Sequence, residues 1–344
     1  MEVSKKNLTS FLYLIFIFIF FLFILNITIS DVRANQAHNT TGIKFTGEYP
    51  DKREDNSGAF RTHCLESHIS LHDPLIFFGN PNMSHLHVFF GNPRTNAFSS
   101  SETLLKTQTT TCDGINENKS AYWVPALFDS YGKRISYIDP LFYYKTGYHV
   151  PAETIIPPPS DLKIIAGNAL SNTFQDIRMA KFRCASWKSS RIWFDQGDPL
   201  DHVNYIPNCP LDDLLEIRIV FPQCWNGDTP YDQDFRSHMA YPIEATPPNS
   251  GTGRCPKTHP HAIPEISFNF AIYVTSETGP SADWRFSSDQ LDIDKGGSSI
   301  HADWINGWEP NTMKKIVENC LNRALDCDVG LLGDGTRLLP VRLE

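Results

Sequence analysis

Short apolar runs alternate with turn residues along most of the chain, from Phe60 onward. Residues 266–273 show this most clearly, because apolar and polar side chains alternate strictly at the start, as in a strand with one buried and one wet face. Similar runs, rich in aliphatic and aromatic residues, occupy 75–78, 122–128, 141–144 and 217–221. Many short strands with almost no helical periodicity predict an all-β fold, an antiparallel β-sandwich or jelly roll with long loops.

One helix interrupts this pattern near the end of the chain. It is expected from about Asn311 to Ala324, with Asn311 as a suitable N-cap. Its apolar residues recur at helical spacing and comprise Met313, Ile316, Val317, Cys320 and Leu321. Such a stripe predicts a C-terminal helix that closes over the sheet.

The same patterns set the expected domain boundaries. We predict a single disulfide-stapled β domain over residues 59–330, a flexible polar lead-in over 35–58 and a C-terminal tail over 331–344. Three prolines at 157–159 predict a rigid crossover inside the domain. A division into two subdomains at that point is the alternative.

The first 34 residues have the pattern of a secretory signal peptide. Lys5 and Lys6 precede an apolar stretch over residues 11–29, and Val32 and Ala34 are small residues at positions −3 and −1 of a cleavage site. The alternative is a signal anchor, because the stretch is almost long enough to span a bilayer. Both predict that the remaining chain faces an extracellular or periplasmic space, attached to a membrane only if the leader stays uncleaved.

Charge and cysteine usage narrow the class of protein. The formal net charge is −9, and lysine and arginine form no cluster beyond the N-terminus, so nucleic acid is not an expected partner. Eight cysteines without a Cys-x-x-Cys pair predict four disulfides formed in an oxidising compartment. The sequence does not fix their connectivity, but neighbouring cysteines suggest the pairs Cys64–Cys112, Cys184–Cys209, Cys224–Cys255 and Cys320–Cys327.

Beyond the predicted leader, three sequons, at Asn39, Asn82 and Asn118, are candidate glycan acceptors. Chance matches to the motif are the alternative for each. A glycan on Asn82 would crowd the neighbouring residues 84–92, which carry the most informative chemistry of the chain.

That segment reads Ser84-His85-Leu86-His87-Val88-Phe89-Phe90-Gly91-Asn92. Its β-branched and aromatic residues predict a strand, and residues two apart on a strand point to the same face. His85 and His87 should therefore project side by side. Imidazole titrates near neutrality and also ligates metals, so the pair indicates a site.

Further histidines extend this candidate site. His238 and His259 each follow a hydroxyl residue, and His301 stands two residues before Asp303. If the segments converge, they supply enough ligands for a divalent ion such as Zn²⁺ or Cu²⁺, with His85, His87 and His238 as the candidate set. Each histidine alone is more often a hydrogen-bonded structural residue.

A metal-free site is the other possibility. A histidine base with Tyr241 and a cation such as Arg236 could abstract and return protons on an acidic sugar, as a lyase requires. The acid/base candidates are His85, His87, His238, His259, Tyr241 and Asp303. No carboxylate pair is marked as that of a glycosidase, and the serine-hydrolase elbow and the phosphate and dinucleotide loops are absent from the sequence.

Tryptophans beside turn residues are candidates for sugar binding. Exposed indole rings stack on pyranose rings, and amide side chains bind hydroxyls. The candidates are Trp123, Trp225, Trp304, Trp308 and Asn306. A place in the core is the alternative for each tryptophan.

Taken together, these segments resemble a widespread secreted family known as the domain of unknown function DUF1996, often joined to wall-associated carbohydrate-binding modules. The matching segments follow the family's order over roughly residues 59–325: 60–64, 73–76, 84–92, 122–127, 221–227, 237–242, 255–260, 263–264 and 301–308. The resemblance implies that the shared motifs include His85, His87, His238, His259, His301 and Asp303. Residues 289–297 look longer than the usual family turn, which leaves the placement of His301 open.

The family brings no established reaction, so function is a hypothesis from the residues. We expect a secreted protein that acts on extracellular polysaccharide or cell wall, with a histidine-dependent hydrolase or lyase site. A non-catalytic wall-binding or structural module is the first alternative. An extracellular metal-binding protein is the second.

Overall fold

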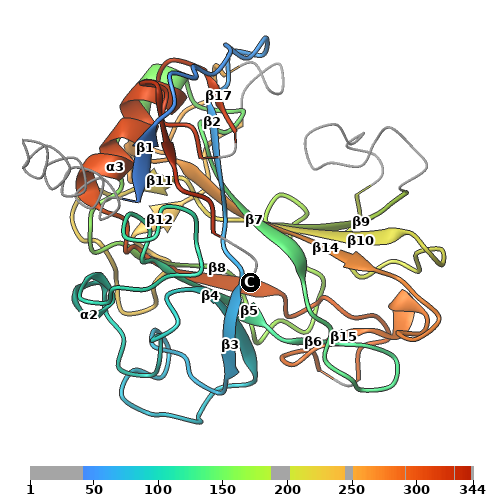
Figure 1. Cartoon of the computed structure of the whole chain (residues 1–344). Helices are drawn as coiled ribbons and strands as arrows, with labels where there is room; N and C mark the ends of the chain where they lie inside the picture. Colours follow the sequence, from blue (N-terminus) through green and yellow to red (C-terminus); the bar gives the residue numbers. More distant parts are fainter. Residues whose placement is uncertain (1–41, 187–201, 245–250, 291, 329, 342–344) are drawn as a thin grey trace, which may run out of the picture. The chain divides into compact units, whose positions relative to one another are not determined.

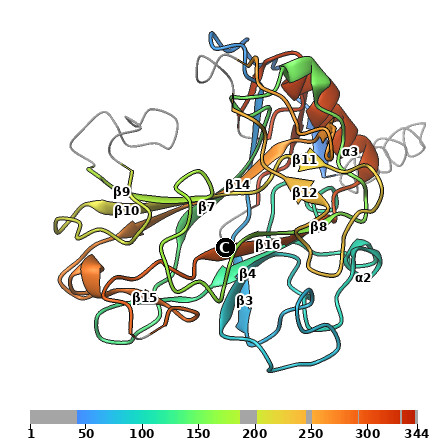
Figure 2. The same cartoon turned by 180° about the vertical axis from the view of Figure 1, so that it is seen from behind.

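Two β-sheets packed face to face form the body of the protein. The structure is a computed structural model that describes residues 42–186, 202–244, 251–290, 292–328 and 330–341. The larger sheet has the strand order β17 (Asp326–Cys327), β2 (Ala59–His63), β7 (Ile138–Lys145), β14 (Glu265–Tyr273), β10 (Leu214–Val220), β9 (Ala180–Ala185). The smaller has the order β3 (Glu66–Ser70), β4 (His87–Gly91), β5 (Ala121–Pro125), β16 (His301–Ile305), β8 (Lys163–Gly167). All pairings in both sheets are antiparallel except β17 with β2, so the predicted all-β sandwich is confirmed (Figures 1 and 2).

Aromatic side chains fill the space between the two sheets. Phe90 on β4 lies 5.6 Å from Phe142 and 5.4 Å from Phe270 of the opposite sheet, between ring centroids. Tyr122 on β5 lies 4.4 Å from Phe142 and 5.5 Å from Phe268. Because residues alternate along a strand, this packing sends the odd-numbered residues of β4, β5 and β16 to the opposite face of the smaller sheet.

The strand that the apolar-polar alternation predicted most clearly, β14, differs from its prediction in one respect. Phe268 and Phe270 are buried in the core as expected, but Ser267 and Asn269 on the other face are buried as well. The prediction that one face of this strand is exposed to solvent is therefore wrong. β14 lies between β7 and β10 in the middle of the sheet, and the Asn269 side chain accepts from Arg218 and donates to Leu141 and Ser267.

Small elements surround the sandwich. Three further sheets are formed by β1 (Ile43–Phe45) with β18 (Thr336–Leu338), by β12 (Met239–Ala240), β11 (Cys224–Trp225) and β13 (His261–Ala262), and by β15 (Arg285–Phe286) with β6 (Leu127–Phe128). The helical elements are α2 (Ser101–Leu105), η1 (Ala152–Thr154), η3 (Ser281–Asp283), α3 (Pro310–Lys315) and η4 (Ile316–Leu321). The pairing of β1 with β18 brings part of the expected lead-in and tail into the same compact unit, Ile43–Glu344.

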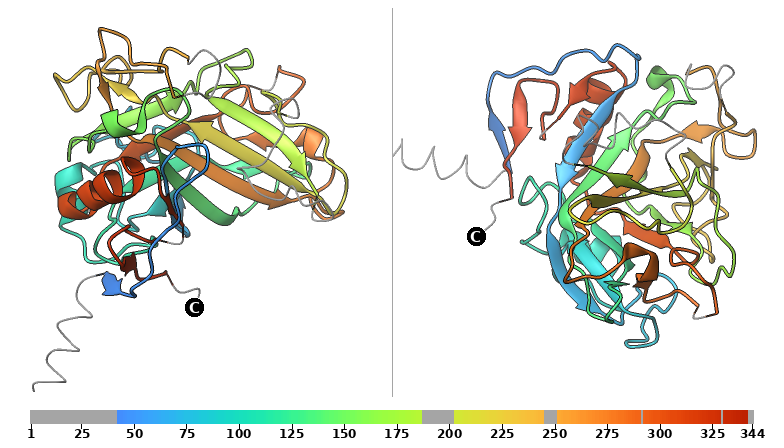
Figure 3. Two further views of the ribbon diagram at one scale, coloured as in Figure 1. Left: turned by 90° about the horizontal axis from the view of Figure 1, so that it is seen from above. Right: turned by 90° about the vertical axis from the view of Figure 1, so that its right-hand side faces the viewer.

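The C-terminal helix is present, but its start and its last turns differ from the prediction. Glu309 is the N-cap, because its carboxylate accepts from the Thr312 N–H at 2.9 Å and Pro310 follows at the first helical position. The expected N-cap Asn311 lies inside the helix. After Lys315 the helix continues as the π-helical segment η4, which packs against β2 (Figure 3).

All four suggested disulfides are present: Cys64–Cys112, Cys184–Cys209, Cys224–Cys255 and Cys320–Cys327. Disulfides of this number are typical of proteins outside the reducing cytosol. The predicted leader lies outside the described residues. Within the described ranges, none of the helices combines the length and the apolar composition needed to cross a bilayer.

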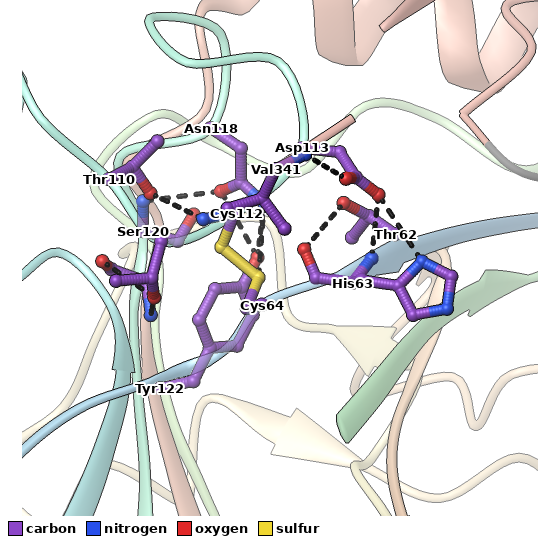
Figure 4. Close-up of a disulfide and its surroundings, with 12 residues drawn as sticks. Thr62, His63, Cys64, Thr110, Cys112, Asp113, Asn118, Ser120, Tyr122 and Val341 are labelled. Carbon is purple, nitrogen blue, oxygen red and sulfur yellow. Dashed lines mark hydrogen bonds and ion pairs between the residues drawn. A yellow bond between two sulfur atoms is a disulfide. The ribbon is translucent and has the colours of Figure 1, made fainter. Parts of the chain in front are cut away.

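The Cys64–Cys112 disulfide lies beside a sequon that the fold has buried (Figure 4). The Asn118 side chain is fully buried, and its amide donates to the Tyr122 hydroxyl at 2.9 Å. Asn82, in contrast, is exposed, at a turn with φ of 63°. Two sequons that are equivalent in sequence therefore differ in the exposure of their asparagine side chains.

In a host that glycosylates, we expect secreted protein to carry a glycan on Asn82 and none on Asn118. A glycan cannot be accommodated on an amide that is enclosed in the core. Peptide mass spectrometry after enzymatic deglycosylation measures the occupancy of each site, with Asn82→Gln as the control. Substantial occupancy of Asn118 in folded protein would contradict the burial described above.

Candidate functional site

Three histidines meet on the outer face of the smaller sheet, the face turned away from the sandwich core. His87 begins β4, His85 lies two residues before it, and His301 begins β16. The strand register pairs His87 with Pro125 and Asp303 with Trp123, which aligns His87, Pro125 and His301 in one row across β4, β5 and β16. The sheet thus brings together residues more than 200 positions apart, on two strands that are separated only by β5.

The ligand atoms of the three rings lie close together. The Nε2 atom of His301 is 3.2 Å from Nε2 of His85 and 3.3 Å from Nε2 of His87. One ligand atom from each of the three residues lies within 4.8 Å of the others. A tetrahedral zinc ion with Zn–N bonds of about 2.0–2.1 Å separates its ligand nitrogens by about 3.3–3.4 Å, so the spacing matches that of metal ligands.

Hydrogen bonds at the other ring nitrogens fix two of the tautomers. Nδ1 of His87 lies 3.0 Å from the His72 carbonyl, and Nδ1 of His301 lies 2.9 Å from the Ser299 carbonyl. Because a carbonyl oxygen only accepts, each Nδ1 carries the proton and each Nε2 presents a lone pair. Two lone pairs facing each other at 3.3 Å repel, and a cation between them removes the repulsion.

A buried carboxylate adjoins the cluster. Oδ2 of Asp303 is 3.8 Å from Nε2 of His301. Asp303 is fully buried, and its Oδ2 has no hydrogen-bond partner among the residues that the structure describes. A buried carboxylate oxygen without a partner is costly, so this atom also indicates a cationic ligand.

Burial keeps the three imidazoles neutral in the ion-free protein. It lowers the pKa of His85 to about 4 and that of His301 to about 3, and it holds the pKa of His87 well below its usual range. Burial, together with the charge of Asp73, raises the pKa of Asp303 well above its usual range. Neutral imidazoles are the form that binds metal, so the protein presents these ligands without first losing protons.

These pKa values predict that acid destabilises the ion-free protein. In the unfolded chain the His301 pKa is about 6.5, so below that pH the unfolded state takes up a proton that the folded state does not, and stability falls as the pH drops from 6.5 towards 3. For His301 alone, the free energy of unfolding should fall by about 2 kcal/mol between pH 7 and pH 5. Denaturant unfolding of chelator-treated protein measures this loss. His301→Asn should lack this share of it, and an equal pH dependence of both proteins would exclude the assignment.

Two other predicted histidines do not join the cluster, so their assignment as site partners of His85 and His87 is wrong. His238 is fully buried, and the ionisable side chains that perturb its pKa are Asp232, Asp234 and His259. The Nε2 atom of His259 bonds to the Ser237 carbonyl at 2.9 Å. His259 thus ties its own loop to the backbone just before β12, and neither histidine belongs to the group of ligand atoms formed by His85, His87 and His301.

Tyr241 is likewise separate from the three histidines. Its hydroxyl donates to the Val220 carbonyl at 2.8 Å, and burial raises its pKa. Tyr241 instead forms part of the wall of a cavity of about 510 Å³, together with Arg236. Its proposed role as acid or base partner of the histidines is not supported, because its proton is committed to a carbonyl.

The predicted sugar-stacking role is wrong for three of the four tryptophans. Trp123, Trp304 and Trp308 are buried, so no ring face is open to a sugar. Trp308 donates to the Tyr144 hydroxyl at 2.8 Å, and the buried amide of Asn306 donates to the Pro159 carbonyl at 2.9 Å. Trp225 alone is half-buried.

The main residue that sequence reasoning left out of the metal set is His301. The signal was present, because His301 and Asp303 stand two apart on a strand in the same way as His85 and His87. The long segment before His301 is anchored by Asp289, whose carboxylate accepts from Phe286, Gly297 and Ser299. After this segment, His301 lies within the cluster, with its Nε2 atom close to those of His85 and His87.

The comparison with known proteins finds a family match over the segments that carry this site. A family model described as "Domain of unknown function (DUF1996)" matches residues 73–308, which include all three clustered histidines and Asp303. Neither a curated protein nor a solved structure matches the chain. The family match covers more than half of the sequence, and the chain therefore belongs to the DUF1996 family.

Proposed function

We propose that the protein is an extracytoplasmic metalloprotein whose centre, formed by His85, His87 and His301, binds Zn²⁺ or a similar divalent transition metal. The observation that carries the proposal is the pair of Nε2 lone pairs at 3.3 Å in His87 and His301, with both Nδ1 atoms held by carbonyls. Imidazole nitrogens of this kind suit Zn²⁺, Cu²⁺ and related ions.

The donor set supports a catalytic rather than a closed structural centre. Structural zinc sites have four protein ligands, whereas three histidines leave one position for water or substrate. His85 is only partly buried, so the centre is approached from its side, while His87 and His301 lie beneath it. Asp303 can accept a proton from a water molecule bound at that open position.

The reaction class that follows is metal-assisted hydrolysis, with extracellular polysaccharide as the substrate class. Metal-bound water is a nucleophile at neutral pH, and the disulfides favour a compartment outside the cytosol. The cavity beside Arg236 offers space for a sugar residue. Burial of three tryptophans favours one rival, a metal-binding protein without sugar turnover.

Metal content and turnover test the proposal separately. We expect purified protein, loaded with Zn²⁺ and dialysed, to hold one ion per chain by elemental analysis and to lose it to a chelator. A panel of plant and fungal wall polysaccharides is then assayed for new reducing ends, with and without metal. Protein that binds no metal overturns the proposal as a whole. Bound metal without turnover overturns the hydrolase and leaves the metal-binding rival.

A further inference from the structure

A second feature lies beside the histidine centre, the cavity of about 510 Å³. Its wall includes the end of β8 at Gly167, the side chains of Gln175 and Met179, and the residues Arg236 and Met239. In the function proposed above, this cavity only provides space for a sugar residue. Its position and its charge allow a more specific assignment.

Hydrogen bonds tie the cavity wall to the strand that carries His301. Gly167 is the register partner of His301 in the pairing of β8 with β16. The Gln175 side chain donates to the Ile300 and Ser298 carbonyls, at 2.8 Å each. A molecule seated in the cavity is therefore next to the histidine centre.

Arg236 supplies a positive charge to the wall. Its Nε and Nη2 donate to the Gly167 carbonyl at 3.2 and 3.0 Å, and its Nη1 donates to the Asp234 carbonyl at 3.2 Å. A guanidinium has five N–H donors, so within the described part of the chain one N–H on each terminal nitrogen remains for a ligand. Asp176, the other charged residue of the wall, is paired with Arg178 at 2.6 Å.

Charged and titratable groups surround the Arg236 guanidinium. Arg236 acts electrostatically on Asp73, His301 and Asp303, which lie on the side of the histidine centre. Three carbonyl bonds fix the orientation of the guanidinium, so little side-chain freedom is lost when a ligand binds. Two parallel N–H donors match the two oxygens of a carboxylate.

We propose that the cavity binds a carboxylate-bearing sugar, a uronic acid residue, with its carboxylate on Arg236. The apolar side chains of Met179, Pro222 and Met239 would pack on the C–H groups of the sugar ring. The proposal names the substrate class of the centre described above and, for turnover, rests on that proposed function. Binding itself does not require it.

Calorimetric titration of the full chain, loaded with Zn²⁺, compares trigalacturonate with its methyl ester. The two probes share the same sugar chain, and in the ester each charged carboxylate is replaced by a neutral methyl ester. We expect the acid to bind at least about tenfold more tightly, the usual size of a hydrogen-bonded charge contact. Equal binding of both probes, or no binding of either, overturns the proposal without the use of a variant.

Variants then locate the contact. Arg236→Gln should abolish the preference for the acid, and Arg236→Lys should retain part of it, because the charge remains but the paired donors are lost. Arg285→Gln is the matched control, since Arg285 is also held by backbone carbonyls, those of Ala282 and Trp284. An unchanged preference in Arg236→Gln, or an equal loss in Arg285→Gln, overturns the assignment.

Elemental analysis of the same samples separates the two proposals. A preference for the acid in protein that holds no metal supports the uronate site and contradicts the metal centre. Bound metal without any preference for the acid contradicts the uronate site alone. Tighter binding of a sulfated galactan oligomer than of the uronate would also overturn the assignment, because the guanidinium would then be selecting charge without the planar geometry.

Discussion

Replacing His87 by alanine is expected to weaken the binding of Zn²⁺ by at least about 100-fold. Loss of a residue that only supports a metal ligand already costs 10–100-fold in affinity, and His87 supplies a ligand atom itself. Its Nε2 lies 3.3 Å from that of His301, and its Nδ1 is fixed on the His72 carbonyl, so no other ring nitrogen replaces it. Competition with a chromogenic chelator measures the affinity.

His259→Ala is the matched control for this experiment. His259 is a half-buried histidine outside the cluster, bonded to the Ser237 carbonyl, so its loss should leave the affinity unchanged. Because His87 is fully buried, His87→Gln serves as a second variant of closer size. Far-ultraviolet circular dichroism confirms the fold of each. Full metal affinity in a folded His87 variant, or an equal loss of affinity in His259→Ala, would contradict the proposed metal centre.

Trp304→Ala is expected to lower the free energy of unfolding by about 3–5 kcal/mol, the range for large aromatic residues removed from cores. Trp304 lies on β16 with none of its surface exposed, and its ring packs 6.3 Å from Tyr144 of the opposite sheet, between centroids. If the indole were a sugar platform, the variant would lose binding and keep its stability. Urea or guanidinium unfolding distinguishes these outcomes.

Trp225→Ala provides the comparison within the same chain. Trp225 is half-buried and donates only one hydrogen bond, to the Thr229 carbonyl at 2.6 Å. Its removal leaves a smaller cavity, and we expect a loss of about 1 kcal/mol, typical of point substitutions. A loss for Trp304→Ala no greater than that for Trp225→Ala would contradict the placement of Trp304 in the core.

The local part of the candidate site was predictable because strand geometry has a fixed period. The spacing of His85 and His87 was enough to predict that the two rings lie side by side, and their centroids are 4.3 Å apart. The same rule applied to His301 and Asp303 would have predicted a second pair. Nothing in the spacing showed that the two pairs meet, because that depends on which strands are neighbours.

The erroneous predictions have a common physical cause. His238, Trp123 and Trp304 have the residue types of a binding site, but residue type does not determine exposure. A tryptophan beside a turn packs equally well into a core or onto a sugar, and the decision depends on what covers it. Asn118 shows the same limit, since its sequon is intact while its amide is enclosed.

The sequence by itself determined the β class, the disulfide-rich character and the first histidine pair, and it suggested the cysteine pairs without fixing them. Each of these depends on residues close together along the chain, where alternation and spacing act directly. Only the tertiary structure brought His301, and not His238, to the side of His85 and His87, and set Arg236 beside this cluster. Strand order and register control which distant residues share a row, and both arise from the packing of the whole sandwich rather than from any one segment.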